Sequence, residues 1–122
     1  MALTLPSPQT PSPACAAQQR AFRKWHAAQA FAQREHWAQA ALEFEQAQAL
    51  HDDAAYGLAA VHAFIKAGRA DAAMQRAQRL RQARPALTLA YTLESHALLE
   101  RGRPEAAGRL LGGIAEHAPG RP

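Results

Sequence analysis

A helix break that recurs at a constant interval is the feature that most constrains what this chain can fold into. Gly68 is followed by Gly102 and Pro85 by Pro119, and the same interval separates both pairs. Each glycine lies between two stretches of helical periodicity, and each proline follows the second of them. Breaks that recur in this way indicate consecutive helical hairpins, because each unit carries one internal turn and one stop.

Small and apolar residues recur in register with these breaks. When the units are counted from Ala21, Ala54 and Thr88, alanine stands at position 20 of each. The chain therefore resembles tetratricopeptide-repeat (TPR) proteins, whose helix-turn-helix unit has the same length. Val61 departs from the pattern at a position that is usually small. The matching positions are Ala28 and Ser95 (position 8), Phe31, Phe64 and Leu98 (position 11), and Ala40, Ala73 and Ala107 (position 20).

The resemblance implies an all-α fold, a right-handed α-solenoid of three TPR-like hairpins. No stretch alternates apolar and polar residues over the length of a strand, which also favours the all-α class. A length of 122 residues suits one small domain. The expected parts are a flexible proline-rich leader (1–17), three repeats within 18–119 (about 21–53, 54–87 and 88–119) and a tail (120–122).

Periodicity and capping residues predict six helices. Asp53 and Thr88 are suited to the N-cap position, because their side chains can accept a hydrogen bond from the first helical turn. Pro104 is expected in the first turn of the last helix, where its missing N–H is tolerated. The predicted helices cover residues 18–33, 37–50, 54–67, 70–84, 87–101 and 104–117.

The composition excludes several classes of protein. Cys15 is the only cysteine, which excludes an intramolecular disulfide and a zinc site built on thiolates. A reducing compartment, the cytoplasm, is therefore expected. The N-terminal segment 1–17 lacks the basic region and apolar run of a signal peptide or membrane anchor, so no membrane partner is expected.

The formal charge of +4 arises largely from arginines near the end of the fourth predicted helix. Such cations can contact phosphate, or they can complement the helix macrodipole and solvate an outer face. No aromatic residue is interleaved with them to stack on bases, so the pattern disfavours a nucleic-acid partner. The residues are Arg76, Arg79, Arg81 and Arg84, preceded by Lys66 and Arg69.

No arrangement of catalytic residues is found, so a non-enzymatic protein without a cofactor or metal is predicted. Gly112 and Gly113 lie inside a predicted helix and lack the lysine and hydroxyl of a phosphate loop. Ser95 occupies a packing position. His62 and His96 fall on the same face of adjacent units. They are interpreted as surface residues or as hydrogen-bonding groups for a ligand. A role as metal ligands is least favoured, since zinc needs further ligands within about 2.1 Å.

The resemblance to TPR proteins implies a binding groove on the first helix of each unit. Its side chains are mostly apolar with a few hydrogen-bonding groups, which suits an extended segment or an amphipathic helix of a partner. Alternatively, they only fill the inside of the superhelix. The basic clamp of chaperone-binding TPR domains is absent, since Trp25, Gln29 and Leu89 stand at its positions. The predicted groove residues are Phe22, Trp25, Gln29, Leu58, His62, Ile65, Lys66, Leu89, Thr92, His96 and Leu99.

The last predicted helix carries apolar side chains that no further helix follows. Solenoids generally need a polar terminal cap to remain soluble. We therefore expect this face to be covered by a partner, by a second copy in a homo-oligomer, or by another part of a longer chain. The residues of this candidate interface are Leu110, Leu111 and Ile114.

Protein–protein interaction is the function that these patterns favour, with Trp25 as the expected anchor because buried aromatic side chains dominate interface energetics. The small size, three repeats and apolar groove resemble the short TPR-type chaperones of type III secretion. This likeness implies a small bacterial chaperone or adaptor in the cytoplasm. The alternative is a scaffolding or regulatory TPR segment of a larger enzyme or complex.

Overall fold

The computed structural model describes residues 12–117 and the side chains of residues 12–113. Over this range the chain is all-helical, as predicted, and contains no strand. The helices are α1 (Pro13–Gln33), α2 (Trp37–Leu50), α3 (Ala54–Lys66), α4 (Ala70–Ala83), α5 (Thr88–Glu100) and α6 (Pro104–His117).

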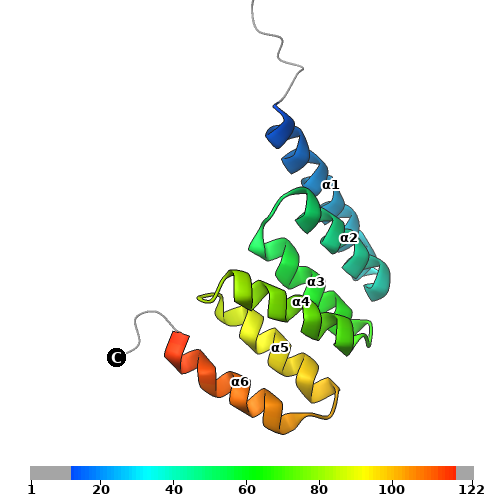
Figure 1. Cartoon of the computed structure of the whole chain (residues 1–122). Coiled ribbons are helices and arrows are strands. Elements are labelled where there is room, and N and C mark those ends of the chain that lie inside the picture. Colours follow the sequence, from blue (N-terminus) through cyan, green and yellow to red (C-terminus); the bar gives the residue numbers. More distant parts are fainter. Residues whose placement is uncertain (1–11, 118–122) are drawn as a thin grey trace, which may run out of the picture.

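The helices are stacked in the order of the sequence, with α1 and α2 at one end and α6 at the other (Figure 1). Each helix packs against the next one along the chain, and α3 also packs against α5. Short turns join α1 to α2, α3 to α4 and α5 to α6, so these pairs form three hairpins. The structure thus places the odd-numbered helices close enough to share a surface.

The turn inside each hairpin has the same backbone geometry. Glu35, Gly68 and Gly102 have φ values of 62°, 76° and 72°, in the left-handed region. In every turn this residue and the next one donate their N–H groups to carbonyls of the last helical turn, which is the Schellman motif. The bonds donated by the next residue run from His36 to Phe31 (2.9 Å), from Arg69 to Phe64 (2.8 Å) and from Arg103 to Leu98 (2.9 Å).

Small side chains form the close contacts between helices. Ala40, Ala73 and Ala107, at position 20 of the three units, are all at most 1% exposed. Small residues at such points allow helices to approach closely. Val61 is also fully buried, and Ser95 donates its hydroxyl to the carbonyl of Ala107 at 3.5 Å. Ser95 therefore acts in packing α5 against α6, as the sequence predicted.

The start of α1 differs from the prediction. The helix begins at Pro13, so residues 13–17 of the expected leader are helical. The Ser12 side chain accepts a hydrogen bond from the Cys15 N–H at 3.1 Å, and proline is favourable at the first helical position. The remainder of the predicted leader and the predicted tail belong to residues 1–11 and 118–122, which lie outside the described residues.

The N-terminus of α5 also differs from the prediction. Thr88 is the first helical residue and does not cap the helix, because Leu87 takes the cap position without a side-chain hydrogen bond. Asp53 does cap α3, and its carboxylate accepts a hydrogen bond from the Ala55 N–H at 2.9 Å. The other helix ends agree with the prediction to within one residue.

Candidate functional site

An open groove with a volume of about 580 Å³ runs across α1, α3 and α5. Two side chains of α2 complete it. Five of the predicted groove residues lie here together: Gln29, Leu58, His62, Leu89 and Thr92. The full lining is Gln29, Ala32, Gln33, Trp37, Phe44, Leu58, Ala59, His62, Leu89, Thr92 and Leu93.

Apolar side chains line most of the groove and connect it to the core. Trp37 is the first residue of α2, directly after the left-handed turn, and its ring meets the His62 ring edge-on at 5.8 Å. Phe44 is 5% exposed, and its ring lies 5.1 Å from that of Trp25. Because the lining continues into packed core residues, the groove is preformed and needs no rearrangement to present an apolar surface.

Polar side chains from all three odd-numbered helices border this apolar lining. Gln29 and Gln33 come from α1, His62 from α3 and Thr92 from α5. The two glutamines have no hydrogen-bond partner within the part of the chain that the structure describes, whereas the Thr92 hydroxyl donates to the Thr88 carbonyl at 3.3 Å. The glutamine amides offer donors and acceptors to a bound molecule.

His62 is the titratable group of the groove. Its pKa is lowered from the ordinary value of 6.5 by partial burial and then by the nearby positive charges of Lys66 and His96. Removal from water disfavours the charged form of a histidine, and a neighbouring cation acts in the same direction. The neutral imidazole is therefore favoured, and it offers one hydrogen-bond donor and one acceptor to a ligand.

Four predicted groove residues lie on the surface outside this groove. Phe22 is 55% exposed and borders a separate hollow at the end of the stack near Tyr56. Lys66 borders a depression beside the turn of the first hairpin. His96 lies 3.5 Å from Glu100 on its own helix, and Leu99 is 53% exposed. These residues extend the surface around the groove without lining it.

Two other predicted groove residues are packing residues. Ile65 is 8% exposed and belongs to the core, because α3 is covered by α2, α4 and α5. Ile65 therefore does not line this groove in the structure, and its part in partner binding stays a prediction. The Trp25 ring lies 5.1 Å from Phe44 and 5.2 Å from Tyr56, so it joins α1 to α2 and α3. The role of Trp25 as a partner anchor stays a prediction.

The predicted arginine surface is largely used in contacts within the chain. Three of the four arginines between residues 76 and 84 form ion pairs with carboxylates of neighbouring segments, whereas Arg79 has no ion pair or hydrogen bond among the described residues. Arginines whose charge is already paired contribute little to the attraction of phosphate. The pairs are Arg76 with Glu45, Arg81 with Glu94 (2.5 Å) and Arg84 with Asp52 (3.3 Å).

The candidate interface on the last helix is exposed in part. Leu111 is 43% exposed, and Leu110 is half-buried. Ile114 lies in α6, but its side chain is outside the described residues. In this stack α6 packs closely only against α5, which leaves one side of it without a neighbouring helix of the described chain.

The groove was predicted without its two α2 residues. These residues are Trp37, directly after the turn of the first hairpin, and Phe44. The place of Trp37 next to the turn at Glu35 was the signal that its ring could reach the following hairpin. Leu93 was likewise assigned no groove role, although it neighbours Thr92.

Among the described side chains, those of residues 12–113, no group of three or more His, Cys, Asp or Glu residues is placed to hold a metal ion. Between residues 12 and 117 no helix combines the length and apolar content needed to cross a membrane. No protein-family model, curated protein or solved structure matches the chain.

Proposed function

We propose that this chain is a TPR-type protein-interaction module whose three hairpins form a right-handed α-solenoid. The proposal is supported by the left-handed turn that recurs at Glu35, Gly68 and Gly102 with the same hydrogen bonds. It is also supported by the buried alanines at position 20 of each hairpin. A unit of this length and construction is the TPR spacing.

The groove across α1, α3 and α5 binds an amphipathic helix of a partner protein. The observation that carries this proposal is an apolar lining from Trp37 to Leu93 that is bordered by glutamines without partners of their own among the described residues. An amphipathic helix matches such a surface, because its apolar face covers the lining and its flanking polar groups reach the amides. Leu89 is 58% exposed at the edge of the groove and would be covered by the bound helix.

The biological role that we infer is that of a small, non-enzymatic bacterial chaperone or adaptor in the cytoplasm. Its size and apolar groove are similar to those of the short TPR-type chaperones of type III secretion. A preformed groove would shield the apolar face of a client helix from water and from other copies of the client, because large exposed apolar surfaces promote association.

Capture followed by calorimetry tests the proposed groove. The full chain is used to capture proteins from the host lysate, the bound segment is mapped and synthesised, and its affinity is measured by isothermal titration. The Leu89→Glu variant places a carboxylate at the groove edge and should weaken binding by about tenfold or more, which corresponds to about 1.4 kcal/mol. The matched control is Leu42→Glu, since Leu42 is 51% exposed on α2 and lies outside the groove lining.

The proposal requires that Leu42→Glu binds like the natural chain and that both variants keep the same helical circular dichroism. Equal affinities for all three chains would contradict it. Equal loss in both variants would also contradict it, because the effect would then come from added charge and not from the groove.

A further inference from the structure

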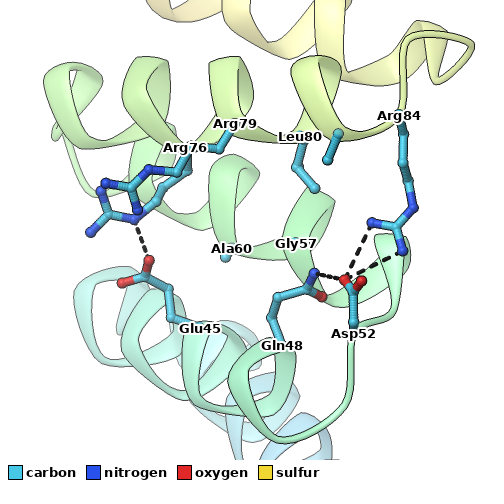
Figure 2. Close-up of a pocket in the computed structure, with 10 residues that line it drawn as sticks. Glu45, Gln48, Asp52, Gly57, Ala60, Arg76, Arg79, Leu80 and Arg84 are labelled. Carbon is cyan, nitrogen blue, oxygen red and sulfur yellow. Dashed lines mark hydrogen bonds and ion pairs between the residues drawn. The ribbon is translucent and has the colours of Figure 1, made fainter.

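A second hollow lies between α2 and α4, over α3, with a volume of about 280 Å³ (Figure 2). Its floor is formed by the buried residues Gly57 and Ala60 of α3 and Leu80 of α4, and the exposed Ala83 also borders it. Polar side chains stand at its two ends. The helices α2 and α4 are not among the pairs that pack closely, so the cleft separates them.

The cleft exists because the repeat is interrupted at three positions. The common turn geometry aligns Glu35 of the first hairpin with Gly68 of the second, and Gly68 with Gly102 of the third. Counting along the chain from these turns gives the equivalent residues at the two junctions between hairpins. The residues differ in kind at three of these positions: Gln48 corresponds to Arg81, Gly57 to Tyr91 and Ala60 to Glu94.

At the second junction the equivalent space is filled. Tyr91 and Glu94 are 6% and 2% exposed. Arg81 lies 2.5 Å from the Glu94 carboxylate, and its guanidinium carbon is 5.8 Å from the centre of the Tyr91 ring. An aromatic ring, a carboxylate and an arginine thus occupy the place that smaller, uncharged side chains leave open at the first junction.

Leu80 takes up only part of the space left at the first junction. A Cβ added to Gly57 would lie 2.8 Å from Leu80 Cδ2, so the leucine leans against the glycine backbone. The remaining cleft is bounded by apolar surface, and one end of it carries an excess of positive charge.

Five charged side chains surround the cleft, three arginines and two carboxylates. Figure 2 shows the Arg84 pair with Asp52 and the Arg76 pair with Glu45 at opposite ends. Arg79 is exposed, extends toward the Glu45 end and has no partner among the described residues. The cleft therefore presents one uncompensated guanidinium beside an apolar floor, which is complementary to a ligand that combines a carboxylate with an apolar group.

We propose that this cleft binds an acidic peptide segment that inserts a tyrosine or phenylalanine ring between α2 and α4 and pairs its carboxylate with Arg79. Such a segment supplies from outside the ring and the carboxylate that Tyr91 and Glu94 supply at the second junction. Arginine also stacks on aromatic faces, as Arg81 does on Tyr91 and Arg76 on Phe64, at 5.6 Å.

The cleft is a different site from the groove. Successive residues of a helix are rotated by about 100°, which places Gly57 and Ala60 on nearly the opposite side of α3 from Leu58 and His62. One partner can therefore occupy each surface at the same time, and variants at one surface leave the other intact.

The probe for this site is the peptide acetyl-Asp-Tyr-Asp-amide, titrated into the full ¹⁵N-labelled chain. The Arg79 Nε–H signal and the Gly57 amide signal should shift in a saturable manner, whereas the Trp37 indole signal in the groove should not move. Replacing the tyrosine of the peptide by alanine should weaken binding about tenfold, because the ring contact is lost. Arg79→Gln should weaken it about threefold to tenfold through the lost charge-assisted contact.

A variant whose side chains fill the cleft provides an independent test. Gln48→Arg combined with Ala60→Glu introduces the arginine and carboxylate of the second junction and should abolish the saturable shift while the helical circular dichroism is kept. If that variant does not fold, the alanine peptide and Arg79→Gln decide the matter. No saturation up to about 10 mM peptide, equal binding of the alanine peptide, or full binding by Arg79→Gln would overturn the proposal.

Discussion

The groove and the cleft lie on opposite sides of α3 and arise in different ways. The groove draws on equivalent positions of neighbouring hairpins, as in the pairs Gln29 and His62 or Leu58 and Thr92. The cleft is confined to the first junction, because Gly57 and Ala60 there are smaller than their counterparts, Tyr91 and Glu94. A repeat pattern therefore predicts the surface that its copies share, whereas the departures from the pattern mark the places where one copy can bind something the others cannot.

The filled junction should be far more sensitive to loss of its arginine than the open one. Arg81→Ala leaves the Glu94 carboxylate buried without its partner, and we expect the free energy of unfolding to fall by about 3 kcal/mol. At the open junction Arg76 and Glu45 are both more than a quarter exposed, so Arg76→Ala should cost about 1 kcal/mol or less. Urea unfolding of both variants measures the difference.

A double variant identifies the cause of the first effect. Arg81→Ala with Glu94→Gln removes the unpaired charge and should recover part of the lost stability, since the two residues are directly coupled. Equal losses for Arg81→Ala and Arg76→Ala would show that the two junctions do not differ in the way described.

Truncation of a side chain in the floor of the cleft should lower the free energy of unfolding less than the same truncation at an enclosed core position. Leu80 is 7% exposed, but it borders the open cleft, so the space left by Leu80→Ala joins solvent. We expect a loss of about 2 kcal/mol, at the low end for deletion of a buried leucine side chain. Leu42→Ala, at an exposed position outside the cleft, should change the unfolding free energy by about 0.5 kcal/mol or less.

Gly57→Ala tests the contact that shapes the cleft. Alanine is favoured over glycine inside a helix by about 1 kcal/mol, but the added Cβ would press on Leu80. We expect the full gain in the Leu80→Ala background and a smaller gain or a loss in the natural chain. Additive effects of the two substitutions in chemical denaturation would contradict this contact.

The smallest expected effect concerns His62 in the groove. Its pKa is below 6.5 in the folded chain, so the unfolded chain binds this proton more readily. Stability from this residue is therefore complete above about pH 6.5 and decreases as the pH falls toward the folded pKa. NMR titration of the imidazole should give the lowered pKa, and Lys66→Gln should raise it by removing a neighbouring cation; an unchanged value would remove Lys66 as a cause.

The helices and the buried small residues were predictable from the sequence because both follow from local spacing. Gly68 and Gly102 identified the turns, and the equivalent Glu35 adopts the same left-handed conformation without being glycine. The first turn of α1 was missed because Ser12 and Pro13 were assigned to the leader, although this pair is a good helix start. Capping and turn residues of this kind can be recognised from the sequence alone.

The candidate site was predictable only in part, because helical spacing does not give the depth at which a residue lies. Leu58 and Ile65 stand about two helical turns apart on one face of α3, but Ile65 is buried by neighbouring helices. The α2 residues of the groove depend on contacts between hairpins. The cleft depends on the small size of Gly57 and Ala60, whose effect is defined by the larger Tyr91 and Glu94 that fill the equivalent space in the next hairpin.

Side-chain NMR signals in the complex with the captured partner segment test the central claim most directly, because Trp37 and Arg79 report on the two sides of α3 separately. The account predicts that the Trp37 indole signal and the Gln29 side-chain amide signals shift on binding, whereas the Arg79 Nε–H signal stays in place. Shifts confined to Arg79, or to α6, with Trp37 and Gln29 unchanged would contradict the assignment of the groove as the binding surface.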